Sequence, residues 1–401
     1  MNRRVCSASL LMLETLIILV YLNPVADLFP SFLQIGIFVL WALFSIRNTK
    51  LWGEALSISI INFIILVFSL LRCVMADQLN TDYYSTLQVV IARYQVFIYP
   101  ILFIYVKGLS NRDKKKIFTL AIACILGTVL VSLYYIAAVD PQAIRNTQRS
   151  VALFGVGDFM LMYAIAIAIG PLLFLIIERR HDKKSNKLLI ISVVLMVVCL
   201  ILCNLVTSVV VAAISIFAMY IVRNKKKYGL VIVAAFAAIA LAARTLLSKA
   251  LFALAGKDLF YWSTNNKIIA IANVLSGDMT NIDTLSRRFM LARWSLESFK
   301  KHPFFGLDWK DHAYGTIGCH MQWADDLGRY GLIGNAIILL SYIRIAKYSV
   351  TSIENSFVKD SMITLWIMFF ILGFLNPCLS ATNLMMMFVV IPACEGMLMD
   401  A

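Results

Sequence analysis

His320 is the residue in this sequence best placed to take a proton during a reaction. It lies between Thr284 and Gly334, a long polar interruption in an otherwise apolar chain that contains three of the four histidines. The imidazole of histidine can be neutral near physiological pH and can accept a proton from a hydroxyl group. A single histidine often has a structural role instead, so the sequence alone leaves both interpretations open.

The charged residues around His320 are sorted by sign along the sequence. Residues 287–301 contain five basic residues and one acid, Glu297. Residues 308–326 contain four acids and one base, Lys310. A positive surface that faces a negative one suits a substrate with an anionic end and a neutral, hydroxylated end. The alternative is that both segments are ordinary solvated faces.

The positive segment has the periodicity of an amphipathic helix between Asp283 and Lys301. Its apolar residues recur at steps of four and three: Leu285, Phe289, Ala292, Leu296 and Phe299. Pro303 disfavours helical backbone at the preceding residue and ends the helix. We expect this helix to lie on the outer surface of a membrane with its apolar stripe towards the lipid.

Arg288 is the arginine of this helix best placed to reach a lipid head group. At about 100° per residue, it falls at one edge of the apolar stripe, whereas Arg287 points away. Arg293 falls on the other side of the stripe. The sequence therefore predicts that Arg288 contacts an anionic substrate.

The composition places the chain in a lipid bilayer. Of its 401 residues, 61% are hydrophobic and only 14% are charged, which is far from the composition of a soluble domain. The net charge of +14 comes mostly from short basic clusters between apolar runs, so we attribute it to membrane orientation and not to nucleic-acid binding. The eight cysteines indicate neither a disulfide framework nor a Cys-x-x-Cys metal pair. We expect an all-α polytopic membrane protein in which residues 1–401 form one integral membrane domain.

Uncharged runs that are long enough to cross a bilayer predict about 12 transmembrane helices. The predicted spans are 6–23, 31–46, 55–74, 87–106, 117–138, 151–177, 188–203, 207–222, 228–247, 329–347, 361–376 and 379–398. Spans seven and eight come from dividing one uncharged run at Asn204, because the run is too long for a single helix. Residues 248–328 then form one large loop between spans nine and ten, and we expect His320 to lie in the first turns of the helix that leads into span ten.

The distribution of basic residues predicts the orientation of the spans. The N-terminal segment and alternate gaps, such as 107–116 and 179–187, contain most of the Lys and Arg residues, whereas the opposing short gaps contain only Arg145 and Arg149. Because positively charged loops stay in the cytoplasm, we expect both termini inside and the loop 248–328 outside. The basic residues of the loop do not oppose this topology, since long loops are translocated regardless of their charge.

Several short motifs follow one another along the loop. They are Arg288, Ser295-Leu296, Pro303 to Gly306, His320, Trp323 with Asp325 or Asp326 and then Leu327, and Tyr330 to Gly334. This pattern resembles the O-antigen polymerase and O-antigen ligase superfamily. The resemblance is specific over this loop, and elsewhere it rests on the number of helices and the late position of the loop.

The resemblance implies a GT-C-like membrane fold and a function. Members of the family are bacterial inner-membrane glycosyltransferases that act, outside the cytoplasmic membrane, on glycans linked to undecaprenyl diphosphate. Carried over to this chain, Arg288 holds the diphosphate and His320 activates the acceptor. Arg149 resembles another external arginine of the family. Arg293 and Asp326 are further candidate substrate-binding residues.

The chain departs from the family pattern at two places. Many members have Gly-x-Gly where this chain has Gly306-Leu307-Asp308, and Ser-Arg where it has Ser208-Val209. The second departure removes one expected diphosphate contact, for which the candidate replacements are Arg145, Arg244 and Arg93. Snorkelling of the last two towards the membrane surface is the alternative to substrate contact. Asp158 is a candidate ion-pair partner for either of them.

The predicted activity is the polymerisation of undecaprenyl-diphosphate-linked oligosaccharide repeat units into O-antigen or capsular polysaccharide. We expect an inverting transfer without a nucleotide cofactor, because the leaving group carries its own phosphates and no GxxxxGK[ST] or GxGxxG motif is present. We also expect no metal, because Asp325 and Asp326 are adjacent, face apart on a helix and make a poor ligand pair. The expected partners are the lipid-linked donor and acceptor glycans, membrane lipid and a regulator of chain length. The alternatives are an O-antigen ligase, a transporter or flippase, and a non-catalytic membrane scaffold.

Overall fold

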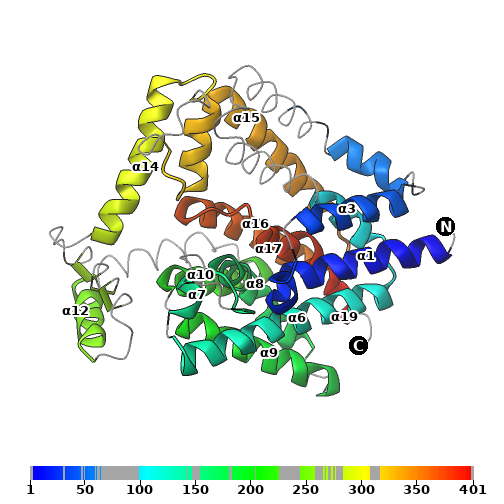
Figure 1. Ribbon diagram of the computed structural model, residues 1–401, viewed down its shortest axis with the longest axis horizontal. Helices are drawn as coiled ribbons and strands as arrows, with labels where there is room; N and C mark the ends of the chain where they lie inside the picture. Colours follow the sequence, from blue (N-terminus) through cyan, green and yellow to red (C-terminus); the bar gives the residue numbers. More distant parts are fainter. Residues whose placement is uncertain are drawn as a thin grey trace.

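The structure is a computed structural model that describes residues 3–29, 32–46, 48, 50–58, 60, 64, 99–140, 142–146, 154–179, 183–203, 205–224, 244–257, 265–266, 268–269, 272–273, 276, 283–307 and 317–398. All regular secondary structure in these residues is helical (Figure 1). The helices are α1 (Arg3–Tyr21), α2 (Asn23–Ala26), α3 (Phe32–Ser45), α6 (Asn111–Ala138), α7 (Ala143–Asn146), α8 (Phe159–Glu178), α9 (Lys183–Leu202), α10 (Val206–Asn224), α12 (Arg244–Ala255), α14 (Asp283–Lys301), α15 (Gln322–Thr351), α16 (Ser356–Leu375), α17 (Ala381–Met385), η3 (Met386–Val390), α18 (Ile391–Ala393) and α19 (Glu395–Leu398). The prediction of an all-α protein is confirmed for this part of the chain.

Five helical segments among the described residues are long and apolar enough to cross a membrane. They are Asn111–Ala138, Phe159–Glu178, Val206–Asn224, Ser356–Leu375 and Ala381–Leu398. Three apolar helices are shorter: Ala8–Tyr21, Leu33–Ser45 and Lys187–Leu202. Most of the predicted spans 55–74, 87–106 and 228–247 fall outside the described residues. The predicted number of 12 spans therefore stays a prediction, whereas a helical membrane architecture is supported.

The division of the long uncharged run at Asn204 is confirmed, because α9 ends at Leu202 and α10 begins at Val206. Helix α9 carries the chain back, so that α8 and α10 pack side by side in parallel. Near their midpoints the Gly170 N–H donates to the Ser215 hydroxyl at 3.2 Å. A side chain at Gly170 would meet the Ser215 carbonyl oxygen at 2.4 Å, so the glycine permits this close helix contact.

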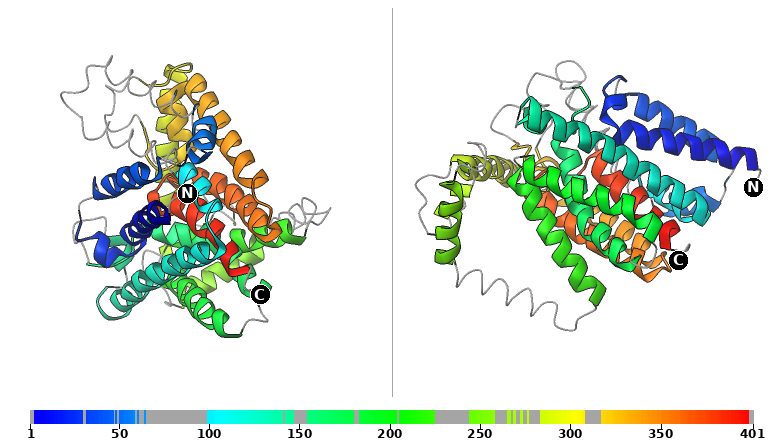
Figure 2. Two further views of the ribbon diagram at one scale, coloured as in Figure 1. Left: turned by 90° about the vertical axis from the view of Figure 1, so that its right-hand side faces the viewer. Right: turned by 90° about the horizontal axis from the view of Figure 1, so that it is seen from below.

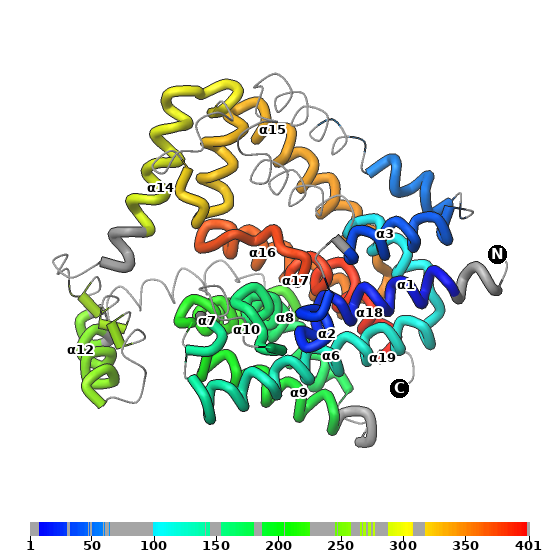
Figure 3. Tube along the Cα trace, viewed as in Figure 1, coloured from blue at the N-terminus to red at the C-terminus, as the bar shows by residue number. Residues whose placement is uncertain are grey.

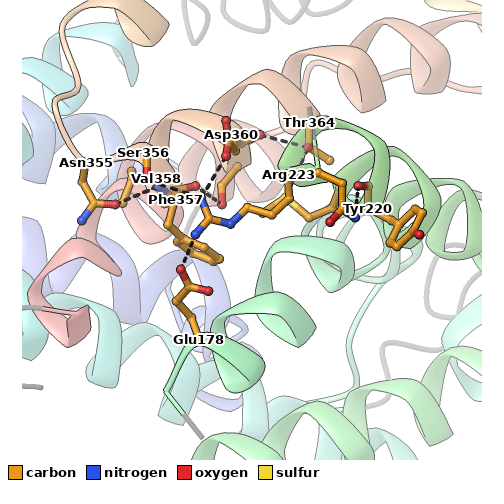
Figure 4. Close-up of polar contacts among 12 residues, drawn as sticks. Glu178, Tyr220, Arg223, Asn355, Ser356, Phe357, Val358, Asp360 and Thr364 are labelled. Atoms are coloured by element: carbon orange, nitrogen blue, oxygen red, sulfur yellow. Dashed lines mark hydrogen bonds and ion pairs between the residues drawn. The ribbon is translucent and has the colours of Figure 1, made fainter. Parts of the chain in front are cut away.

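Arg223 joins the last turns of α8 and α10 to the first turn of α16 (Figure 4). Its guanidinium donates to Asp360 at 3.1 Å and to Glu178. It also lies over the ring of Phe357, 5.7 Å from the centroid. The Asn355 side chain caps the start of α16 by accepting from two backbone N–H groups. One cation thus holds three helices together at one end of the bundle.

Side-chain caps explain why two predicted spans begin elsewhere. The Ser110 hydroxyl accepts from the Asp113 N–H and starts α6 at Asn111, six residues before the predicted start at 117. Asp158 caps α8, which begins at Phe159, after the predicted start at 151. Gly155 precedes this cap with a φ of 80°, a backbone conformation that favours glycine. In both cases a local hydrogen bond, and not hydrophobicity, sets the first turn.

The C-terminal helix contains a wider turn in its middle. Residues Met386–Val390 form the π-helical segment η3, and all five are buried. Pro392 follows directly in α18. Proline has no N–H to donate to the carbonyl four residues earlier and its ring crowds that carbonyl, which favours a local widening of the helix. Helices α6 and α8 pack against this irregular segment, and Trp366 of α16 contacts the Phe388 ring within it.

Helices α12 and α14 lie at one end of the bundle and the two termini lie at the other (Figures 1 and 2). We call these the loop end and the terminal end. In Figure 1, α14 stands upright, whereas α1, α6 and α16 run closer to the horizontal. Helix α14 therefore crosses the loop end at a steep angle to the bundle helices, as expected for a helix that lies along a membrane surface.

Candidate functional site

Helix α14 has the bounds that the sequence predicts, Asp283–Lys301. It packs against α15 with the face that carries Leu291, Ser295 and Ser298, all of which are buried. The predicted apolar stripe lies largely on another face, where Phe289 is 71% exposed and Leu296 is 42% exposed. The stripe is thus available to lipid, while small and polar side chains make the contact with α15.

Ser295 and Asp325 form a buried link between α14 and α15. The Ser295 hydroxyl donates to Asp325 Oδ1 at 2.6 Å and accepts from the Gly318 N–H at 2.9 Å. The other carboxylate oxygen of Asp325 accepts from the Met321 N–H at 3.1 Å. Three hydrogen bonds therefore hold residues 318–321, which include His320, against both helices.

Asp325→Ala is expected to loosen this segment. The substitution leaves the buried Ser295 hydroxyl and the Met321 N–H without their acceptor, and each lost hydrogen bond to a charged group costs about 1.5–3 kcal/mol. We expect a lower unfolding temperature for the purified protein in detergent. Glu297→Ala is the matched control, because Glu297 makes an exposed pair with Arg293 on the same helix, and exposed pairs contribute at most about 1 kcal/mol. Equal unfolding temperatures for both variants would contradict the role of Asp325.

The turn after α14 inserts its backbone into a break in α15. The Leu307 N–H donates to the Gly328 carbonyl at 2.8 Å, and the Leu332 N–H donates to the Pro303 carbonyl at 2.8 Å. A side chain at Gly306 would meet the Arg329 carbonyl oxygen at 2.2 Å. The Pro303–Gly306 and Tyr330–Gly334 motifs are therefore two halves of one structure, beside the upper end of α14 in Figure 3.

Gly331 breaks α15 into two legs. Its φ of 62° and ψ of −166° are not helical and belong to a region that is open almost only to glycine. The helix that leads into span ten is therefore kinked at Gly331. The prediction that His320 lies in the first turns of this helix is wrong, because Met321 is the N-cap residue and α15 begins at Gln322.

Trp323 anchors the first leg of α15 to the last turns of α16. The indole N–H donates to the Phe370 carbonyl at 2.8 Å. The ring also lies so close to Gly373 that a side chain there would meet it at 2.2 Å. His320 precedes the helix, whereas Trp323 packs into an aromatic cluster with Tyr342, Phe369 and Phe370.

His320 is exposed and lies close to α14. Its Nδ1 atom is 3.1 Å from the Cys319 carbonyl oxygen, and Cys319 has a φ of 56°. The chain crosses α14 at Leu291, where a side chain at Gly318 would meet the Leu291 carbonyl oxygen at 2.3 Å. Arg288 precedes Leu291 by three residues, which is about 4.5 Å along a helix axis. The structure thus brings the His320 segment beside the part of α14 that carries Arg288.

Arg288 is partly buried, and its charge acts on a residue of the bundle. The guanidinium lies within electrostatic range of the Tyr163 hydroxyl in the first turns of α8. The Tyr163 hydroxyl is in turn hydrogen-bonded to the side chain of Thr207 in the first turn of α10. Neither Tyr163 nor Thr207 is among the residues that the sequence singles out, because more than a hundred residues separate Tyr163 from Arg288 in the chain.

The two other candidate residues of the loop have partners in the protein. Arg293 is exposed, and its Nε donates to Glu297 at 2.6 Å. Asp326 is fully buried, and its Oδ1 accepts from the Gln322 amide at 3.0 Å. Burial of Asp326 favours a structural role over the predicted contact with substrate.

The structure does not describe the side chains of the remaining candidate arginines. Arg93 and Arg149 lie outside the described residues, whereas Arg145 and Arg244 lie in α7 and α12 with side chains that the structure does not describe. Asp158 serves as the cap of α8, with its Oδ1 accepting from the Leu161 N–H at 2.8 Å. Burial raises the pKa of the Asp158 carboxyl above its ordinary value, and hydrogen bonds from the first turn of α8 oppose that rise.

The described residues contain no cluster of three or more His, Cys, Asp or Glu side chains that could hold a metal ion. The neighbouring acids Asp325 and Asp326 accept hydrogen bonds from different partners and do not converge. A guanidinium, two hydroxyls and an exposed imidazole are therefore the groups that this site offers. Comparison with protein-family models and comparison with curated protein sequences each find no match to the chain.

Proposed function

We propose that the chain is a membrane glycosyltransferase that joins oligosaccharide repeat units carried on undecaprenyl diphosphate. The observation that supports this proposal most directly is the crossing of α14 by residues 318–320, which brings an exposed imidazole beside the helix turn of a partly buried guanidinium. Arg288 and His320 are also the two residues for which the resemblance to the O-antigen polymerase and ligase superfamily implies roles. A lipid-linked glycan presents a diphosphate and a hydroxylated sugar together, which suits one cation and one base.

The proposed reaction is a single displacement at the anomeric carbon of the donor. A hydroxyl oxygen of the acceptor sugar attacks this carbon while the bond to the diphosphate oxygen breaks. The hydroxyl proton passes to the His320 imidazole, and the electron pair of the broken bond leaves with the diphosphate. Arg288 stabilises the negative charge that develops there, because a guanidinium matches phosphate oxygens in geometry and charge. One displacement inverts the configuration of the anomeric carbon.

The proposed topology places α14 and His320 outside the cytoplasmic membrane and the termini inside. Lys114 pairs with Glu395 at 2.6 Å, which places residues 107–116 beside the last helical segment. Lys116 pairs with Glu14 of α1 at 2.7 Å. These lysines lie in the basic gap 107–116, which is expected to stay in the cytoplasm.

The test of the proposed function uses the purified full chain and one defined lipid-linked repeat unit. We expect a ladder of products that differ by one repeat, and the same ladder in the presence of a chelator. Loss of the ladder on chelation would refute metal independence. If no ladder forms without chelator and the single repeats stay unchanged, the polymerase proposal is refuted.

A gene deletion in cells distinguishes the polymerase from the ligase. Deletion of the gene is expected to leave single lipid-linked repeats and to abolish long chains, while surface glycan of one unit persists. If long chains instead accumulate on the carrier and never reach a final acceptor, the protein is a ligase. Unchanged surface glycan would leave a transporter or scaffold role.

A further inference from the structure

A polar cavity lies at the terminal end of the bundle, where α18 and α19 approach the start of α6 (Figure 3). Its volume is about 230 Å³, which is below the about 300–1,000 Å³ of most ligand pockets. The cavity is lined by the helical residues 99–107, the first turn of α6, the loop between α15 and α16, and the chain from α18 to α19. It has room for a small polar group but not for a sugar chain.

Lys114 is a buried cation in this cavity. The residue is only 6% exposed, and its ammonium donates to Glu395 at 2.6 Å. The next residue, Gly396, lets α19 pack directly on α6, because a side chain there would meet the Lys115 nitrogen at 2.4 Å. An ammonium has three N–H donors. Glu395 is the one acceptor for it among the described residues, so two buried donors remain for a ligand.

Lys107 and Glu354 are the partly exposed charges of the cavity, and only the lysine has a partner. Lys107 Nζ lies 3.8 Å from Glu54 Oε2 and 3.4 Å from the Tyr348 hydroxyl. Glu354 is exposed and forms no ion pair with any residue that the structure describes. The cavity therefore offers spare N–H donors together with a spare carboxylate.

The Ser352 hydroxyl is a further unsatisfied group on the wall of the cavity. Its oxygen is buried and has no hydrogen-bond partner among the described residues. A buried hydroxyl without a partner costs free energy, and a ligand that makes a hydrogen bond to it recovers that cost. The apolar part of the wall, which includes Phe103, Ile353 and Val358, is buried and fixes the shape of the site.

We infer that this cavity binds a zwitterion made of a phosphate and a primary ammonium, the chemistry of an aminophospholipid headgroup. The phosphate oxygens accept from Lys114 and Lys107, and the ammonium donates to Glu354. A simple anion would be repelled by the glutamates and a simple cation by the lysines, whereas a zwitterion complements both. The inference does not depend on the proposed function, because the cavity and the α14 site lie at opposite ends of the bundle.

The test measures equilibrium binding to the purified full chain in detergent after removal of lipid. The probes are short-chain phosphatidylethanolamine, phosphatidylcholine and phosphatidylglycerol, and glycerophosphoethanolamine, which lacks acyl chains. Phosphatidylethanolamine should bind at least about tenfold more tightly than the other two lipids, the effect of one hydrogen bond between charged groups. The trimethylated ammonium of phosphatidylcholine cannot donate to Glu354, and phosphatidylglycerol has no ammonium.

Glu354→Gln keeps the size of the side chain and removes its charge. It is expected to weaken the binding of phosphatidylethanolamine by about tenfold. The binding of phosphatidylglycerol should stay level or become tighter, because a repulsive charge is removed. The matched control is Glu297→Gln, which makes the same change in a partly exposed acid of α14 at the loop end and should bind both lipids as wild type does.

Ser352→Ala separates a ligand contact from an effect on the fold. The hydroxyl has no partner in the free protein, so its removal should leave the unfolding temperature without ligand level or higher. The affinity for phosphatidylethanolamine should nevertheless fall several-fold. An unchanged affinity would show that the ligand does not reach the buried hydroxyl, against the inference.

The remaining results either support or overturn the inference. Equal affinity of wild type for phosphatidylethanolamine and phosphatidylcholine, or equal affinity of wild type and Glu354→Gln for phosphatidylethanolamine, indicates only lipid around the bundle and overturns it. Selective binding that glycerophosphoethanolamine displaces supports the inference and shows that the headgroup suffices. Selective binding without displacement supports it with the phospholipid as the ligand. Glycan transfer enters none of these measurements, so the inference and the proposed function can fail separately.

Discussion

His320→Ala is expected to lower the rate of glycan transfer by about 10²–10⁴-fold, the usual contribution of a general base. His320 is exposed beside α14, and no other described histidine lies in the segment that crosses this helix. Without an imidazole, the acceptor hydroxyl must lose its proton to water as it attacks. The measurement is the single-turnover rate of transfer between a lipid-linked donor and an acceptor at saturating concentrations of both.

His302→Ala is the matched control for this prediction. His302 is also exposed and follows directly after α14, but it lies at the end of the helix that is away from Arg288. We expect the control to retain the wild-type rate within about twofold, a loss far below that of a missing base. If both variants were equally active, the imidazole of His320 would not be the base. If both lost activity and also unfolded at a lower temperature, the loss would be structural.

Patterns that depend on neighbours in the sequence were sufficient to place the elements of the site. The spacing of Phe289, Leu296 and their neighbours predicts α14, and Pro303 predicts its end, because helix periodicity and the constraint before proline are local effects. The break near Asn204 follows from length alone. The apolar run begins at residue 151, but the cap by Asp158 starts α8 only at Phe159, so the predicted start is too early.

The interior of the site depends on contacts that no local pattern encodes. Arg288 acts electrostatically on Tyr163, which lies more than a hundred residues away in the chain. The non-helical backbone at Gly331 depends on the Pro303 and Phe304 carbonyls, which come from a different element. The acids Asp325 and Asp326 look equivalent in sequence, yet one links α14 to α15 and the other is buried beside Gln322. Their roles are set by tertiary packing.

Gly331→Ala is expected to destabilise the junction of α14 and α15 by about 2–6 kcal/mol. The φ of 62° with a ψ of −166° is strained for any residue with a side chain, which costs about 1–3 kcal/mol. The added carbon would also lie 2.4 Å from the Gly306 nitrogen and 2.6 Å from the Phe304 carbonyl oxygen. Both are backbone atoms, so neither can rotate away, and such overpacking costs about 1–3 kcal/mol more.

The same chemical change at Gly36 is expected to have the opposite sign. Gly36 lies inside α3, and a side chain there would meet nothing within 4 Å. Alanine in a helix interior is favoured over glycine by about 0.5–1 kcal/mol. The unfolding temperature of the purified protein should therefore fall for Gly331→Ala and stay level or rise for Gly36→Ala. A Gly331→Ala protein that unfolds with wild-type stability would mean that the turn after α14 does not insert into a break in α15, and the placement of His320 beside Arg288 would lose its structural basis.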